Sequence, residues 1–426
     1  MISAFKKRLL FFWTLLLVLF RPSILGEQYN PIVFFLFLIT TVLLFVIDPE
    51  SLKRFMSRKV FIAFLLVALI VIYFLVQGLL LSSAKATVIN STVVILGVSI
   101  CIAYVSRREN IPVILKAFIN IFFFLSLSAF VTYAILILDG FDWSKIPVVA
   151  NLSSLVPGYP VYKQGDLGNH LLFFPFTAVW SATSIAGITL PRFIGLFREP
   201  GMAQLYFLTA YFLTYFVDIK RVKLKRRVIL FAVFLTFSTG ALLSFLGGFL
   251  MFKLFGKGKM PSVSKLTFTM VTLSIIIFLF AIIPNLGFLN KMSSRSGKDR
   301  SKSFDSSLQL LSKSPVVGTG YYNDFIKNDK DVVVSKQFLG LLGVAYQIGI
   351  IGIILYAIIW YYGLSRLANL QTLCIYMPCL LTLIFSQPSY NDVIVFFLIL
   401  TDTSNLKLTN FKKIENTTEG ISGTVA

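Results

Sequence analysis

Long apolar runs separated by short charged loops dominate the 426-residue sequence. Most of these runs approach the roughly 17–25 residues that a helix needs to cross the hydrocarbon of a bilayer. The pattern predicts an all-α polytopic membrane protein with about 11–12 membrane helices, in a single integral-membrane domain over residues 1–402. The expected helices lie at residues 9–20, 31–47, 60–81, 88–105, 117–138, 202–217, 228–255, 266–283, 338–362, 370–385 and 393–400.

Basic residues mark one side of this predicted bundle. The loops at 6–8, 53–59 and 107–116 are rich in Lys and Arg, whereas each loop between them carries a single basic residue. By the positive-inside rule the first set of loops is cytoplasmic, and so are both termini. The polar tail at 403–426 is expected to be disordered in the cytoplasm.

Two long loops, 139–199 and 284–336, then face the outside. Within the first loop, residues 171–187 are apolar enough to resemble a membrane span. A crossing there would move the most basic short loop, 220–227, to the outside. We therefore interpret 171–187 as an interfacial or re-entrant segment, interrupted at Pro175.

The run at 228–255 allows two interpretations. Its 28 residues would extend about 42 Å as one helix, which is long for one crossing and short for two. Ser-Thr-Gly at 238–240 interrupts the run, and we favour a broken hairpin whose interrupted backbone lines a protected cavity. In the run at 338–362, by contrast, Gly349 and two other glycines are expected to allow close contact with neighbouring helices.

The composition excludes several other classes of protein. Hydrophobic side chains make up 57% and charged side chains 13%, with a mean hydropathy of +0.84, whereas a soluble domain carries about 25% charged residues. The net charge of +21 does not indicate nucleic-acid binding, because Lys and Arg lie in short loops between apolar runs. The three cysteines fall in apolar runs and the chain has one histidine, so no metal site is predicted.

A charged segment at 192–201, with the sequence R-F-I-G-L-F-R-E-P-G, precedes one of the apolar runs. Pro200 suits the first position of a helix, because its missing N–H has no helical partner there. Arg198 and Glu199 would then lie at the membrane surface or just inside a cavity. Interfacial anchoring by arginine is the simpler alternative.

The second long loop has a related arrangement. It carries R-S-G-K-D-R at 295–300, a stretch of helical character at 306–312, and S-P-V-V-G-T-G-Y at 314–321. Together with the first segment, this arrangement resembles the Wzy-type O-antigen polymerases, whose superfamily includes the O-antigen ligases, and implies a GT-C-like membrane fold. In the ligases a histidine usually follows the glycine motif, but here residues 332–337 read V-V-V-S-K-Q, which favours a polymerase.

The resemblance implies a glycosyltransferase of the bacterial inner membrane that joins undecaprenyl-diphosphate-linked oligosaccharide repeat units on the external face. The leaving group is a lipid diphosphate, which the planar arginine fork binds well, and no cofactor is expected. Membrane lipid and a chain-length regulator protein are the other expected partners. The expected catalytic residues are Arg198, Glu199 and Arg295, with Glu199 as the first candidate for a base. The residues expected to bind the diphosphate or the glycan are Asp166, His170, Arg192, Arg300, Gly318, Gly320 and Tyr321.

Several of these assignments have structural alternatives. Glu199 can pair with a neighbouring arginine or stabilise a helix N-terminus electrostatically. His170 suits a solvated loop, and Gly318 and Gly320 suit a turn without a ligand. The weaker candidates for a base are Asp166, His170, Asp299 and Asp305.

Other functions remain open beside the polymerase. An O-antigen ligase belongs to the same superfamily, and a lipid-linked oligosaccharide flippase or exporter is the main alternative of another class, ahead of a non-enzymatic scaffold. A transporter would place charges in the middle of several spans, where the headgroup must pass. Here the charges avoid the spans and gather in the two long loops, which favours chemistry at the membrane surface.

Overall fold

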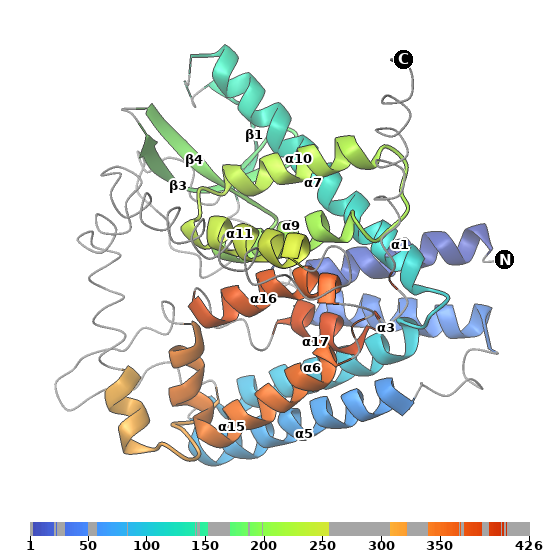
Figure 1. The fold of residues 1–426 in the computed structure, drawn as a ribbon, viewed down its shortest axis with the longest axis vertical. Helices are drawn as coiled ribbons and strands as arrows, with labels where there is room; N and C mark the ends of the chain where they lie inside the picture. The colour runs from blue at the N-terminus through green and yellow to red at the C-terminus, as the bar shows by residue number, and fades with distance from the viewer. Residues whose placement is uncertain are drawn as a thin grey trace, which may run out of the picture.

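The protein is a mostly helical, multi-pass membrane protein with one small antiparallel sheet (Figure 1). The computed structural model describes residues 3–20, 23, 30–49, 58–82, 84–140, 142, 145–151, 171–185, 188–197, 199–254, 307–321, 340–365, 367, 370–385, 392–401, 403 and 406. Its helices are α1 (Ala4–Leu19), α3 (Asn30–Ile47), α5 (Arg58–Leu81), α6 (Lys85–Val105), α7 (Ile111–Leu138), α9 (Pro200–Leu213), α10 (Val222–Leu235), α11 (Thr239–Leu254), α15 (Gly340–Leu364), α16 (Leu373–Phe385) and α17 (Val393–Leu400), with a 3₁₀ turn at Leu370–Thr372. These bounds follow the predicted apolar runs closely, apart from 266–283, which lies outside the described residues.

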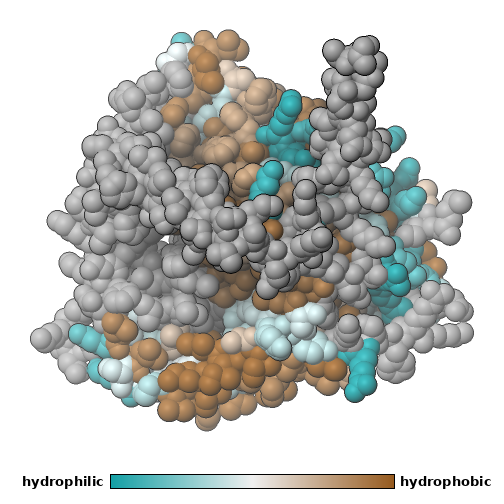
Figure 2. Space-filling model, viewed as in Figure 1, coloured by the Kyte–Doolittle hydropathy of each residue, from teal (hydrophilic) through white to brown (hydrophobic). Residues whose placement is uncertain are grey.

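Five helices in the described part of the chain are long and apolar enough to cross a membrane, namely α3, α5, α6, α7 and α15. Helix α5 shows how they divide their surface: Val67, Ile70 and Phe74 are fully buried. Large exposed side chains recur every three or four residues along its opposite face, at Phe61, Leu65, Leu69, Ile72, Val76 and Leu80. This spacing makes one apolar stripe along the helix, as expected of a lipid-facing surface. Figure 2 shows hydrophobic surface over the part of the molecule where α5 and α15 lie.

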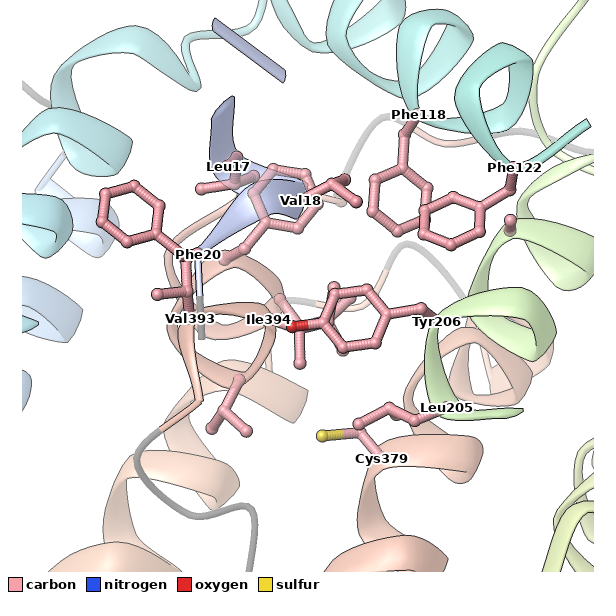
Figure 3. Packing of buried hydrophobic residues seen from close by; sticks show 14 of the residues in the cluster. Leu17, Val18, Phe20, Phe118, Phe122, Leu205, Tyr206, Cys379, Val393 and Ile394 are labelled. Carbon is pink, nitrogen blue, oxygen red and sulfur yellow. The ribbon is translucent and has the colours of Figure 1, made fainter. Parts of the chain in front are cut away.

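Helix α9 forms the centre of the molecule. All 14 of its residues are buried, although it is too short to span a membrane alone. Around Tyr206 of α9 gather apolar side chains from α1, α7, α16 and α17, among them Phe118, Phe122, Cys379 and Ile394 (Figure 3). The short helix α17 is likewise buried at every position, so these two helices form a core and do not face lipid.

The four-stranded sheet has the order β1 (Val148–Asn151), β2 (Leu171–Phe173), β3 (Thr177–Ile185) and β4 (Ile188–Gly195), with neighbouring strands antiparallel. The sequence predicts an interfacial or re-entrant segment at 171–187, and the structure has strands there. Pro175 lies in the turn between β2 and β3. The Thr, Ile, Val and Trp side chains of this region favour a half-buried strand, which a count of apolar residues alone does not reveal.

Hydroxyl groups attach the sheet to the end of α7. Ser128 Oγ and Thr132 Oγ1 lie 3.0 and 2.9 Å from Thr177 Oγ1, and Tyr133 donates a hydrogen bond to the carbonyl of Pro191. The sheet and the helical turn at 307–313 lie at the same end of the bundle, opposite the N-terminus (Figure 1). Segments of both long loops are therefore on one side, and the compartment that this side faces stays a prediction.

Two helices are interrupted. The run at 228–255 forms α10 and α11, separated by residues 236–238, where Phe237 has a φ of +44°. The predicted break is confirmed, because residues 236–238 are not helical. At 1.5 Å per residue, α10 and α11 extend only about 21 and 24 Å. Helix α15 is also interrupted, at Gly349 with φ +64° and ψ −176°. The expected role of Gly349 in helix contact is thus wrong, because its backbone ends one helical segment and begins the next. We call these interruptions the α10/α11 break (residues 236–238) and the α15 break (residues 345–350).

Candidate functional site at two broken helices

Buried aromatic residues position the first charged motif. Phe193 and Phe197 are fully buried, and their rings lie 5.2 Å from Phe207 and 4.4 Å from Tyr206, both on α9. Between them the chain turns, with the Phe197 N–H donating to the Ile194 carbonyl at 3.0 Å. Because successive side chains of a strand point to opposite faces, burying Phe193 directs Arg192 of β4 away from the same core. The burial of Phe193 thus orients the neighbouring Arg192.

Glu199 and Pro200 begin α9 as the sequence predicts. Pro200 is the first helical residue, and Glu199 precedes it with an extended backbone. The Glu199 carbonyl accepts hydrogen bonds from the N–H groups of Met202 and Ala203, at 3.1 and 3.0 Å. Its carboxylate makes no capping hydrogen bond to the helix and is half-buried. This position is compatible with a base and with an electrostatic partner of an arginine.

Arg192 connects the first long loop to the α10/α11 break. Its Nε donates a hydrogen bond of 3.1 Å to the carbonyl of Thr236, the C-cap residue directly after α10. A cation at a helix C-terminus is favourable, because the last carbonyls carry partial negative charge. Arg192 is half-buried, and its partner Thr236 directly precedes Phe237 with its left-handed φ of +44°. The structure therefore places a predicted substrate-binding arginine at the junction of α10 and α11.

Gln204 approaches the same break from α9. Its side chain is fully buried, and neither its Nε2 nor its Oε1 has a hydrogen-bond partner. A Cβ added at Gly240 would lie 2.9 Å from Gln204 Nε2 and 3.6 Å from the Ser238 hydroxyl oxygen. Gly240 thus allows the amide to lie directly against the first turn of α11.

The second motif, S-P-V-V-G-T-G-Y at 314–321, fits into the α15 break. The N–H groups of Thr319 and Gly320 donate to the carbonyls of Tyr346 and Gln347, at 2.8 and 3.1 Å. In return the carbonyls of Pro315 and Val316 accept from the N–H groups of Ile350 and Ile351, at 3.0 and 3.2 Å. The loop therefore supplies partners to backbone groups that the interrupted helix cannot satisfy by itself.

Gly318 and Gly349 make this close approach possible. A Cβ added at Gly318 would lie 2.4 Å from the Gln347 carbonyl oxygen, and one at Gly349 would lie 2.4 Å from the Val316 carbonyl oxygen. Gly318 and Gly320 also have φ angles of +81° and +117°, which side chains rarely allow. These contacts agree with the structural alternative for the two motif glycines.

Side chains of α5 complete the α15 break. Gln77 Nε2 donates to the carbonyls of Val317 and Gln347, the second at 2.6 Å, while its Oε1 accepts from the Tyr321 N–H at 3.1 Å. The Tyr73 hydroxyl donates to the carbonyls of Ile348 and Val317, at 2.6 and 3.1 Å. Tyr321 itself is fully buried and stacks on Phe74 with ring centres 4.6 Å apart. Its burial indicates a role in packing.

The other predicted site residues lie outside the described part of the chain: Asp166, His170, Arg198, Arg295 and Arg300, with the weaker candidates Asp299 and Asp305. The expected convergence of four arginines therefore stays a prediction. Within the described residues, no group of three or more His, Cys, Asp or Glu side chains could hold a metal ion.

The predictions omitted the polar residues that surround the two breaks. Three of them lie inside apolar helices: Tyr73, Gln77 and Gln204. An amide or hydroxyl side chain in an otherwise apolar run is the sequence signal that could have identified them. The chemistry open to this region follows from its groups. The half-buried Arg192 and the N-terminus of α11 can hold an anionic group, and the Glu199 carboxylate at the start of α9 can accept a proton from a hydroxyl.

Comparison with known proteins relates part of the chain to a described family. A family model described as O-antigen ligase matches residues 228–357, which are 130 of the 426 residues. Neither the comparison with curated proteins nor that with solved structures gives a match. The matched region begins in α10, contains the α10/α11 break and ends in α15 after its own break. It supports membership of this chain in the superfamily of O-antigen polymerases and ligases, as the sequence motifs predict.

Proposed function

We propose that the protein is a surface-polysaccharide polymerase, which transfers a growing glycan from its undecaprenyl diphosphate carrier to a sugar hydroxyl of a new lipid-linked repeat unit. The observation that carries this proposal is the hydrogen bond from Arg192 to Thr236. It places a cation from the first long loop at an interrupted helix within the region that matches the superfamily. A departing lipid diphosphate needs such a cation at the membrane surface.

In this mechanism the acceptor hydroxyl attacks the anomeric carbon of the growing glycan and the bond to the diphosphate breaks. Arginine stabilises the negative charge that develops on the leaving diphosphate, an effect worth on the order of 10²- to 10³-fold in rate per donor. Glu199 accepts the proton of the attacking hydroxyl. Arg192, Arg198, Arg295 and Arg300 are proposed to hold the diphosphate, while Gly318, Gly320 and Tyr321 hold the second loop in place.

A ligase is the second candidate, because the matching family model is described by that activity. Against it stands the single histidine of the chain, His170, which precedes the glycine motif by more than a hundred residues. Superfamily ligases usually carry a histidine after that motif. The two candidates differ in acceptor, since a ligase transfers a finished chain to another molecule.

Deletion of the gene followed by gel analysis of the glycans separates the candidates. Loss of a polymerase leaves carriers with one repeat unit, loss of a ligase leaves long undelivered chains, and loss of a flippase leaves no surface glycan. We expect single repeat units, restored to long chains by the wild-type gene. Long undelivered chains in the deletion strain would contradict the proposal.

A substitution at Arg198 tests the leaving-group role. Arg198→Lys keeps the charge and loses the bidentate fork, so we expect shorter chains at normal membrane abundance. Arg227→Lys, in the basic first half of α10, is the matched control and should leave chain length unchanged. Normal chain lengths with Arg198→Lys would assign Arg198 to interfacial anchoring, where lysine serves as well.

A further inference from the structure

The buried amide of Gln204 is the starting observation. It is fully buried in α9, and neither polar atom has a hydrogen-bond partner. An unpaired buried amide is unfavourable, because folding removes its hydrogen bonds to water without replacing them. A group that binds next to Gln204 would replace them.

The N-terminus of α11 provides further donors beside this amide. Ala241 and Leu242 donate to the Ser238 carbonyl, at 3.0 and 3.3 Å, and the amides before them belong to the turn that has no preceding helical carbonyl. The helix is 16 residues long, and its first turn contains no acidic side chain. Its partial positive charge is therefore not offset by a carboxylate from its own first turn.

The surroundings favour an anion over a neutral group. Arg192 brings a guanidinium to the same break through its bond to Thr236. Ser238 and Gly240 are half-buried, so part of the break keeps accessible surface, whereas Gln204 beside Gly240 is fully buried. An arginine, a helix N-terminus and an amide N–H together suit the oxygen atoms of a phosphoryl group.

We infer that the α10/α11 break binds a phosphoryl group of the lipid-linked substrate, with Gln204 Nε2 and the first amides of α11 as donors. The identity of the ligand as a lipid-linked substrate rests on the proposed function, whereas the site itself rests on the geometry of the break. Gln204 is thus a substrate-binding residue that no charge pattern indicates.

Ligand-dependent thermal unfolding of the full-length protein in detergent tests the inference. The probes are a polyprenyl diphosphate, phosphatidylglycerol and inorganic pyrophosphate, each titrated against the unfolding midpoint. For wild-type protein we expect the polyprenyl diphosphate to raise the midpoint in a saturable way. For Gln204→Met, which is similar in length and lacks the amide, we expect about 10- to 100-fold weaker binding, typical of a lost hydrogen bond to a charged group.

Two further variants sharpen the result. Gly240→Ala adds a methyl group 2.9 Å from Gln204 Nε2 without altering α9, and should weaken binding as Gln204→Met does. Tyr206→Phe is the matched control, because Tyr206 is equally buried on α9 but faces the core beside Ile394 (Figure 3). It should bind like wild type. Wild-type affinity in both Gln204→Met and Gly240→Ala would overturn the inference.

The probes also identify the source of the phosphoryl group. Protection by the polyprenyl diphosphate alone supports the lipid-linked substrate, equal protection by phosphatidylglycerol supports a site for lipid headgroups, and protection by pyrophosphate supports recognition without a lipid. No protection of wild-type protein by any probe would overturn the site. Binding without chain growth in cells would contradict only the polymerase, and chain growth unaffected by Gln204→Met would contradict only this inference.

Discussion

The two broken helices differ in how their backbone and the groups beside it are satisfied. At the α15 break, the loop at 314–321 fills the interruption, and Gln77 and Tyr73 bond the surrounding carbonyls. At the α10/α11 break, Arg192 bonds one carbonyl, while the buried Gln204 beside it has no partner. Each break is associated with one of the two long loops.

This difference separates structure from function. A buried polar group without a partner costs about 1–3 kcal/mol, so a fold retains one only where something else offsets the cost. The α15 break has its hydrogen bonds and serves to hold the second loop. The α10/α11 break keeps unused hydrogen-bonding capacity in Gln204, and binding of a ligand is the use that we propose for it. Gln77 and Gln204 are both buried, but the side-chain amide of Gln77 is hydrogen-bonded and that of Gln204 is not.

The largest expected effect is at Gly318. Gly318→Ala puts a methyl group 2.4 Å from the Gln347 carbonyl oxygen at a φ of +81°, so overpacking and backbone strain add to about 3–5 kcal/mol of destabilisation. We expect the protein to be lost from the membrane, as measured by immunoblot and thermal unfolding.

Gly140→Ala is the matched control for Gly318→Ala. Gly140 also has a positive φ, +66°, but a Cβ there meets nothing within 4 Å. Only the strain of about 1–2 kcal/mol applies. Equal abundance of the two variants would show that the close contact at the α15 break is not required.

Next in size is the effect of Arg192 on chain growth. Arg192→Ala removes a cation from the α10/α11 break and should lower the rate of polymerisation on the order of 10²-fold, with Lys intermediate. The measurement is glycan chain length against time in membranes of equal protein content.

Arg226→Ala controls for the loss of an arginine at a helix end. Arg226 Nε and one terminal nitrogen donate to Thr214, which ends α9, at 3.0 and 3.3 Å, much as Arg192 donates to Thr236. Arg226→Ala should reduce stability without changing the rate per molecule. A similar loss of rate in both variants would reduce Arg192 to a structural role.

How far sequence could anticipate these results depends on the kind of residue. Apolar runs give the helices within a few residues, and Ser-Thr-Gly at 238–240 marks the first break. The α15 break escapes notice, because Gly349 in an apolar run is also typical of close helix contact. Its cause lies 28–34 residues upstream, in the backbone of Pro315 to Tyr321, and such long-range backbone pairing leaves no local pattern. For the same reason the partner of Arg192 could not be named.

The paired glutamines give a smaller and more diagnostic effect. Gln77→Met removes one donor from each of the carbonyls of Val317 and Gln347, which keep their bonds from Tyr73 and Gly320, and removes the side-chain acceptor of the Tyr321 N–H. We expect a cost of about 1–3 kcal/mol in unfolding free energy. Gln204→Met, in protein without ligand, removes an amide that has no bond to lose. Its stability should equal that of wild type or exceed it by about 1 kcal/mol. Thermal unfolding of both variants under one condition provides the comparison, and equal destabilisation would mean that the two breaks do not differ as we describe.

The smallest expected effect is at Tyr73. Tyr73→Phe keeps the ring and removes a hydroxyl that donates to the carbonyls of Ile348 and Val317, at 2.6 and 3.1 Å. Both carbonyls belong to the α15 break, and Gln77 still donates to Val317, so only the bond to Ile348 is lost without replacement. We expect a cost of about 1 kcal/mol, visible as a small fall in the thermal midpoint.

Because the α15 break holds a loop and is not proposed to bind substrate, the affinity of Tyr73→Phe for a polyprenyl diphosphate should remain that of wild type. A Tyr73→Phe variant with normal stability and weakened binding would instead join the two breaks into one site.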